Sequence, residues 1–376
     1  MTDTLQRRRR GPAPKKRPEW VIVETLGIDA GEEPAVVAEG GNDKDFSRLD
    51  RQKWAIARSP YEGVHLSQVA KKTIAKVVAK RGVVFEEEVI PNVGQQDDLK
   101  VTIIADPVFS PHGEVFGVQL WIGQTGETIP GPRTVGSFEW DYQTQETEHG
   151  PGTEQEIFGI DPADGGRGIQ EVWNFFTAFD RFEEYEQYVR DFAEGTVDPG
   201  ASFAAEVSVK RADKEGSSLL TFMTVRARQT ERGKRIVGLV HDITSDTKSP
   251  KRDLDRETVR TAAALIADAS PEPVGVCHLT LATGLFLDWY HAPPGPLARW
   301  ANQVPMIHPK SQEEFLEARN ALREGKTSGV DLVLFVRFRE DEGWIPADLK
   351  IMAVGRGETV SQGLVQARLG HPPLLW

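Results

Sequence analysis

The residues best suited to chemistry in this sequence are its single cysteine, Cys277, and its eight histidines. His278 follows Cys277 directly in Val274–His278, which reads as a β-strand. Adjacent strand residues point to opposite faces, so this pair cannot hold one metal ion. No set of histidine, cysteine and acidic residues has zinc-site spacing, so we expect no metal site. Cys277 is interpreted as a buried structural thiol.

Cofactor and catalytic motifs are also missing from the sequence. His308 precedes Pro309 at an expected helix start, where it fits a turn better than a haem ligand. Glycine-rich phosphate loops and the GxSxG nucleophile motif do not occur. We therefore expect no cofactor and no catalytic residue, and interpret the chain as a non-enzyme. The acidic run Glu183–Glu186 is interpreted as a solvated helix face.

Charge is unevenly distributed along the 376 residues, which carry a net charge of −12. Residues 1–19 contain seven basic and two acidic side chains, a balance of +5, which leaves −17 for the remainder. This acidic remainder disfavours nucleic-acid binding by the folded body. The basic segment is predicted to be a disordered tail, although it could contact nucleic acid, anionic lipid or an acidic partner.

Hydrophobic patterning predicts a protein without a membrane span. The longest apolar runs, such as Val330–Val336, have the length of strands and fall short of the ~18 apolar residues of a membrane helix. No apolar segment of a secretory signal follows the N-terminal arginines. With only one cysteine, these features favour the cytoplasm.

A strand–turn–strand pattern occurs three times. The first copy spans 101–122, the second 220–243, and the third runs from 347 to 369. Each returning strand contains a glycine followed by an aliphatic residue, at Gly117, Gly238 and Gly363, which lie 121 and 125 residues apart. That interval has the length of a domain. Because a hairpin is too small to be stable alone, we predict three related domains that each end in two antiparallel strands.

The intervening segments complete an α+β pattern of antiparallel sheets flanked by helices. Leu66–Val78 has apolar residues at i, i+3, i+4 and i+7 spacing with lysines opposite, which predicts a helix that packs on a sheet. A second helix is predicted over 258–269, with Val259, Ala262, Ala263, Ile266 and Ala269 on its packed face. A capping box at Ser311–Glu314 predicts a third helix.

The second unit resembles a PAS domain. Phe138–Asp141 is similar to the first strand of that family, Glu156–Pro162 to its "LFG-hydrophobic-x-P" helix end, and Phe203–Arg211 to its third strand. Val237–Thr244 is similar to the closing "GxxxDIT" motif. The resemblance covers most of residues 135–246.

The other two units resemble sensor domains less closely. In the third, Ile307–Ser311 is similar to the "HPDD" helix start and Phe335–Arg337 to the third PAS strand. The first resembles a GAF domain or a degenerate PAS domain. The whole chain resembles actinobacterial proteins built only of such domains. The predicted order is a tail (1–19), a GAF-like domain (20–124), a PAS domain (135–246), a linker helix (247–270) and a divergent PAS-like domain (271–370).

This resemblance implies a non-catalytic sensor or scaffold protein that binds a small ligand or protein partners of a signalling pathway and relays signals in trans. PAS domains hold ligands in an apolar cavity between sheet and helices. The candidate cavity residues are aromatic: Trp140, Phe158, Trp173, Phe176 and Phe222. A packed core without a ligand would explain the same residues. Two alternatives remain, namely an enzyme with an unrecognised hydrolytic site and a transcription-linked adaptor that uses the basic tail.

Overall fold

A computed structural model of the chain describes residues 17–28, 31–91, 97–245, 248–251, 254–354 and 362–370. Its contacts divide the chain into two compact units. The first consists of residues 1–25, 33–107 and 117–133, and the second of residues 26–32, 108–116 and 134–376. Most of the predicted basic tail lies outside the described residues.

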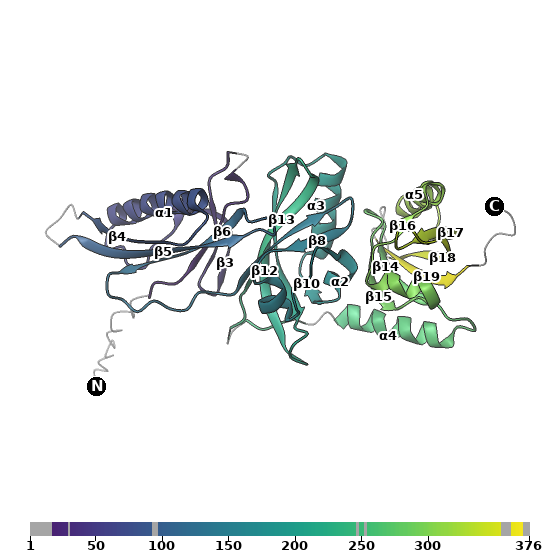
Figure 1. Cartoon of the computed structure of the whole chain (residues 1–376). Coiled ribbons are helices and arrows are strands. Elements are labelled where there is room, and N and C mark those ends of the chain that lie inside the picture. The colour runs from purple at the N-terminus through teal and green to yellow at the C-terminus, as the bar shows by residue number, and fades with distance from the viewer. Residues whose placement is uncertain are drawn as a thin grey trace, which may run out of the picture. The chain divides into compact units, whose positions relative to one another are not determined.

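The first sheet has six antiparallel strands in the order β3-β2-β1-β6-β5-β4. Figure 1 labels β3, β4, β5 and β6 of this sheet together with helix α1. They are β1 (Val21–Glu24), β2 (Ala35–Glu39), β3 (Asn42–Arg48), β4 (Val84–Ile90), β5 (Leu99–Phe109) and β6 (Val115–Gln124). Helix α1 (Pro60–Lys80) begins after Ser59, whose hydroxyl accepts a hydrogen bond from the Glu62 amide. It buries Leu66, Ala70, Ile74 and Val77, which confirms the predicted helix and its packed face.

The second sheet has seven strands in the order β10-β11-β12-β13-β7-β8-β9. They are β7 (Val135–Asp141), β8 (Glu146–His149), β9 (Arg167–Gly168), β10 (Phe176–Phe179), β11 (Ser202–Lys210), β12 (Ser218–Thr230) and β13 (Gly233–Asp242). Its helical segments are η3 (Thr153–Phe158), α2 (Ile169–Trp173) and α3 (Phe182–Glu194). Long strands rich in Val, Phe and Thr favour this pleated arrangement.

The third sheet has six strands in the order β15-β14-β19-β18-β17-β16. They are β14 (Gly275–Thr280), β15 (Phe286–His291), β16 (Met306–Ile307), β17 (Gly329–Arg337), β18 (Ile345–Val354) and β19 (Gln362–Leu369). Its helical segments are α4 (Leu254–Ala269), η4 (Gly295–Ala301) and α5 (Pro309–Arg323). Cys277 is fully buried in its core, which confirms the expected structural thiol.

All three sheets share one connectivity, in which the first strand lies between the second strand and the last. The repeated glycines occupy equivalent last strands, and each pairs with the first strand of its sheet. Gly117 lies opposite Glu24, Gly238 opposite Phe138, and Gly363 opposite Leu279. At Gly238 an added Cβ would lie 2.7 Å from Phe138 Cζ and 2.8 Å from the Thr224 carbonyl oxygen, so only glycine fits there without a shift. The repeat seen in the sequence is therefore a repeat of the fold.

Two helices differ in detail from the sequence-based predictions. Helix α4 buries Ala263 and Ala267, whereas Val259 and Ile266 are exposed, so the predicted packed face is right at Ala263 and wrong at Val259 and Ile266. Alanine side chains are small enough for α4 to pack closely on β14 and β15, whereas the larger side chains of Val259 and Ile266 lie on the exposed face of the helix. Helix α5 begins after His308, whose Nδ1 accepts a hydrogen bond from the Lys310 amide. The predicted capping box is therefore not the helix start.

Among the described residues, no helix combines the length and the apolar character that a membrane crossing requires.

Candidate functional site

The second sheet and its helices enclose a cavity of about 70 Å³. A single water molecule needs only ~10–15 Å³ of such space, so the cavity has room for a small organic molecule. Its wall is almost entirely apolar, and nine of the 20 wall residues outside the third sheet are aromatic or histidine. These are Phe138, Trp140, His149, Phe158, Trp173, Phe176, Phe179, Phe182 and Tyr185, together with Val172 and other aliphatic residues.

Four of the five predicted cavity residues line this space: Trp140, Phe158, Trp173 and Phe176. Phe222 does not. Side chains alternate between the two faces of a strand, and the neighbours of Phe222 in β12, Thr221 and Met223, face the cavity. Phe222 instead packs against the ring of His241 on the opposite face, with 5.7 Å between ring centroids. The prediction for Phe222 is therefore wrong, although the strand assignment is right.

Helix α3 forms one side of the cavity. Phe182, Tyr185, Glu186 and Val189 lie at i, i+3, i+4 and i+7, so they share the face that lines the space. Glu183 and Glu184 are exposed, as expected for a solvated face, but Glu186 is only 6% exposed. The interpretation of the whole acidic run as solvated is thus wrong at Glu186.

Three side chains on the cavity wall carry buried polar atoms without a hydrogen-bond partner among the described residues. They are the indole nitrogen of Trp140, the hydroxyl of Thr147 and both carboxylate oxygens of Glu186. Leaving such groups unsatisfied costs roughly 1–3 kcal/mol each, more for a charged group. A ligand with one or two polar atoms could satisfy them, so the cavity is chemically suited to a mostly apolar molecule with a hydrogen-bonding group.

Burial governs the protonation of Glu186. Desolvation, helped by the charge of Glu183 and opposed by that of Arg190, raises the pKa of Glu186 from 4.5 to about 8. The carboxyl group is therefore mostly neutral at pH 7 and can donate a hydrogen bond. Burial also raises the pKa of Tyr185, so its hydroxyl stays protonated.

A second carboxylate near the cavity has the opposite character. His149, which lines the cavity, contacts Glu154 through Nδ1 at 2.9 Å, and Arg167 Nε donates to the same carboxylate at 2.6 Å. Burial of Glu154 opposes ionisation, but these two partners and the Ala163 amide outweigh it and hold the pKa of Glu154 at about 2. Glu154 is therefore ionised at neutral pH, and its contacts with His149 and Arg167 join η3 to β8 and β9.

The third sheet contributes to the same cavity. Leu285 and Leu287 belong to the hydrophobic core of the second sheet, although they lie in and before β15. Thr280, the last residue of β14, and Thr283, from the turn between β14 and β15, also line the cavity. A molecule bound there would touch residues of both sheets.

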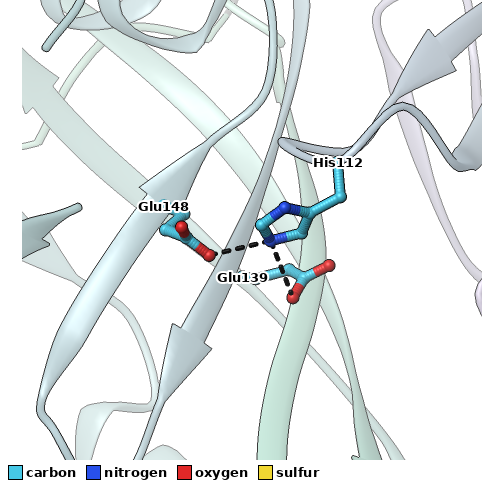
Figure 2. A group of neighbouring side chains, drawn as sticks. All are labelled: His112, Glu139 and Glu148. Atoms are coloured by element: carbon cyan, nitrogen blue, oxygen red, sulfur yellow. Dashed lines mark hydrogen bonds and ion pairs between the residues drawn. The ribbon is translucent and has the colours of Figure 1, made fainter. Parts of the chain in front are cut away.

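A separate polar cluster lies on the far side of β7. Figure 2 shows His112, Glu139 and Glu148 with their side chains directed toward one another. His112 Nε2 lies 2.8 Å from Glu148 Oε2 and 3.7 Å from Glu139 Oε2. His112 belongs to the turn between β5 and β6, a segment that is part of the second unit, and the two glutamates lie in β7 and β8.

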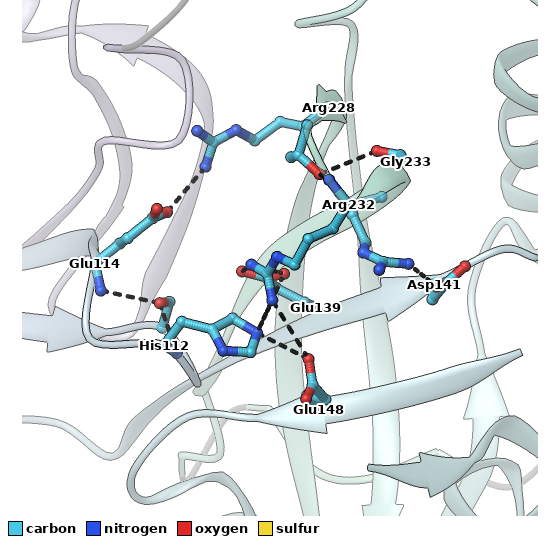
Figure 3. A network of polar contacts seen from close by, with 11 residues as sticks. His112, Glu114, Glu139, Asp141, Glu148, Arg228, Arg232 and Gly233 are labelled. Carbon is cyan, nitrogen blue, oxygen red and sulfur yellow. Dashed lines mark hydrogen bonds and ion pairs between the residues drawn. The ribbon is translucent and has the colours of Figure 1, made fainter. Parts of the chain in front are cut away.

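Arginines complete this network (Figure 3). Arg232, on the turn between β12 and β13, donates to Glu139 at 3.1 Å and contacts His112 Nε2. Arg228 lies 3.6 Å from Glu114. Desolvation raises the pKa of Glu139, and the charges of Arg232 and His112 only partly oppose this effect.

No local sequence pattern indicates this cluster, because its members are separated by 27 and 9 residues and come from one turn and two strands. Glu186, by contrast, lies four residues after Phe182 and three before Val189. This helical spacing places it on their apolar face and could have been recognised in the sequence. His308 caps α5, in agreement with a structural role.

Comparison with protein families matches residues 19–131 to a family described as Rv3651-like, N-terminal. The match covers less than a third of the chain. The comparison with curated proteins found no match.

Among solved structures, the chain is similar to an uncharacterized protein from Mycobacterium tuberculosis. The TM-score is 0.62 at 21% identity, over 94% of this chain and 96% of that chain, which shows a shared fold. An RNA-binding light-oxygen-voltage receptor gives a TM-score of 0.24 at 13% identity, over 62% of this chain and 94% of that chain. The Escherichia coli DhaR(N)–DhaL complex gives 0.19 at 10% identity, over 61% and 80%. The last two similarities are too low to indicate function.

Proposed function

We propose that this protein is a non-catalytic sensor that binds a small, mainly apolar molecule in the cavity of the second sheet. The observation that carries this proposal is an aromatic cavity whose wall also holds unsatisfied polar atoms of Trp140, Thr147 and Glu186. A core packed to normal density would leave no free volume beside these groups, whereas here they border a cavity of about 70 Å³.

The proposal includes the identity of the domains. We interpret the second and third sheets as PAS-like domains and the first as a GAF-like domain. The motifs around Phe138–Asp141 and Val237–Thr244 support this for the second sheet. The connectivity common to all three sheets supports their interpretation as repeated sensor domains.

Relay would use the leucines that reach the cavity from the third sheet. A ligand shifts a conformational equilibrium only if it binds two conformations with different affinity. Leu285 and Leu287 are buried in the core of the second sheet, so a ligand that fills the cavity changes what surrounds them. Protein partners that bind the third sheet would then respond to this change, so the signal would pass to them in trans.

The ligand class follows from the wall. A neutral Glu186 can donate a hydrogen bond, and the described part of the wall contains no lysine or arginine, so an anion would lose its hydration without gaining a charged partner. Neutral ligands such as phenol or indole, and the cation benzylamine by cation–π contact with the aromatic wall, are therefore expected to bind better than benzoate.

The test is a titration of the full chain with phenol, indole, benzylamine and benzoate, followed by tryptophan fluorescence and by thermal unfolding. Val207→Phe fills the cavity from β11, and Phe222→Leu is the matched control on the opposite face of β12. We expect saturable binding of neutral or cationic probes to the wild type and to Phe222→Leu, and none to Val207→Phe. Equal binding to both variants would refute the proposal.

A further inference from the structure

We infer that His112, Glu139 and Glu148 form a binding site for a divalent transition-metal ion of the zinc type. This site is independent of the aromatic cavity and of the proposed ligand.

The two glutamates are paired by the strand register. Glu139 in β7 lies directly opposite Glu148 in β8, so both side chains project from the same face of neighbouring antiparallel strands. Like charges in this position repel each other. The Glu139 carboxylate is also almost fully buried, with a side-chain exposure of 4%. Such a pair calls for a cation between its members.

The imidazole supplies the third ligand from outside the sheet. His112 Nε2 contacts Glu148 and approaches Glu139, and all three ligand atoms lie within 4.8 Å of one another. Bonds of about 2.0–2.2 Å to zinc place neighbouring ligand atoms about 3.0–3.5 Å apart. Shifts of roughly 1 Å in side chains would therefore be sufficient. A nitrogen with two carboxylate oxygens is a donor set typical of zinc and similar metals rather than of magnesium.

Arg232 is the cation that this site holds without a metal ion. Its guanidinium contacts His112 Nε2 and donates to Glu139, and it lies 3.8 Å from Glu148. One positive charge faces two carboxylates, so a divalent ion in its place would balance the charge.

Arg232 can leave without disrupting the core. Its side chain is 42% exposed and lies on the turn between β12 and β13. His112 and Glu148 are also partly exposed, which gives an ion access from solvent. Displacement of Arg232 toward solvent is thus the structural step that accompanies metal binding.

Calorimetric titration of the tag-free, chelator-treated full chain with Zn²⁺ tests this inference. The variants are His112→Gln and Glu148→Gln, both at partly exposed positions. Glu114→Gln is the matched control, because it removes one exposed carboxylate from the same turn without touching the three ligands. We expect one site per chain, at least tenfold weaker binding in the two ligand variants, and unchanged binding in the control.

Arg232→Ala separates metal binding from a merely structural network. If the guanidinium competes with the ion, this variant binds Zn²⁺ more tightly than the wild type, and Zn²⁺ raises its Tm by more. Absence of a saturable site in the wild type, equal affinity in Glu148→Gln and Glu114→Gln, or weaker binding in Arg232→Ala would each overturn the inference.

Discussion

Replacement of Glu186 by glutamine should remove a large pH dependence from the stability of the second unit. In the folded chain the pKa of Glu186 is about 8, against an ordinary value of 4.5. Because the folded chain binds the Glu186 proton more tightly than the unfolded chain, this group stabilises the folded state fully below pH 4.5. The contribution is lost as the pH rises through 8. At about 1.36 kcal/mol per pH unit, the full loss is about 5 kcal/mol, and roughly half of it falls between pH 5 and pH 7.

The measurement is the free energy of unfolding in urea at several pH values from 5 to 8.5, for the wild type and for Glu186→Gln. Glutamine has the same shape and no charge, so the wild type should lose stability relative to the variant as the pH rises. Glu184→Gln is the control, because Glu184 is exposed and belongs to the same helix. Parallel curves for the wild type and Glu186→Gln would refute the burial of an ionisable group at this position.

Further substitutions test other parts of the structure. Gly238→Ala should destabilise the chain by about 1–3 kcal/mol in urea unfolding, because its Cβ meets Phe138 and the Thr224 carbonyl, whereas Gly63→Ala in α1 meets open space and should stabilise by up to ~1 kcal/mol. Glu154→Gln should remove a contribution of up to about 3 kcal/mol that is present above pH 4.5 and is lost as the pH falls toward 2; acid unfolding curves that match the wild type would contradict this. Leu287→Ala should cost about 2–5 kcal/mol and weaken probe binding, while the exposed Leu316→Ala should change stability by less than ~0.5 kcal/mol; equal Tm values for both would contradict the burial of Leu287.

The sequence predicted the repeat and most strands because these depend on local patterns. Glycines before aliphatic residues marked the last strand of each sheet, and the spacing of Leu66–Val78 predicted α1. Strand alternation alone does not say which face meets a cavity, and for this reason Phe222 was assigned to the wrong side. The packing of α4 through Ala263 and Ala267 depends on close approach to a sheet, which apolar periodicity does not encode.

The sites were less predictable than the fold. The cavity needed residues from the third sheet, Leu285 and Leu287, that no local motif connects to Trp140. The cluster of His112, Glu139 and Glu148 arises from strand register and from a turn in another part of the chain. Acidic runs are usually solvated, and only the position of Glu186 on the apolar face of α3 distinguishes it from its neighbours.

The most direct test of ligand binding and relay is a methyl NMR titration of the full chain with indole. We expect that the methyl signals of Val189, Val207, Leu285 and Leu287 shift together and saturate at one indole per chain, and that Val207→Phe abolishes these shifts. Shifts confined to methyl groups away from the cavity, or shifts of Val189 that leave Leu285 and Leu287 unchanged, would contradict it.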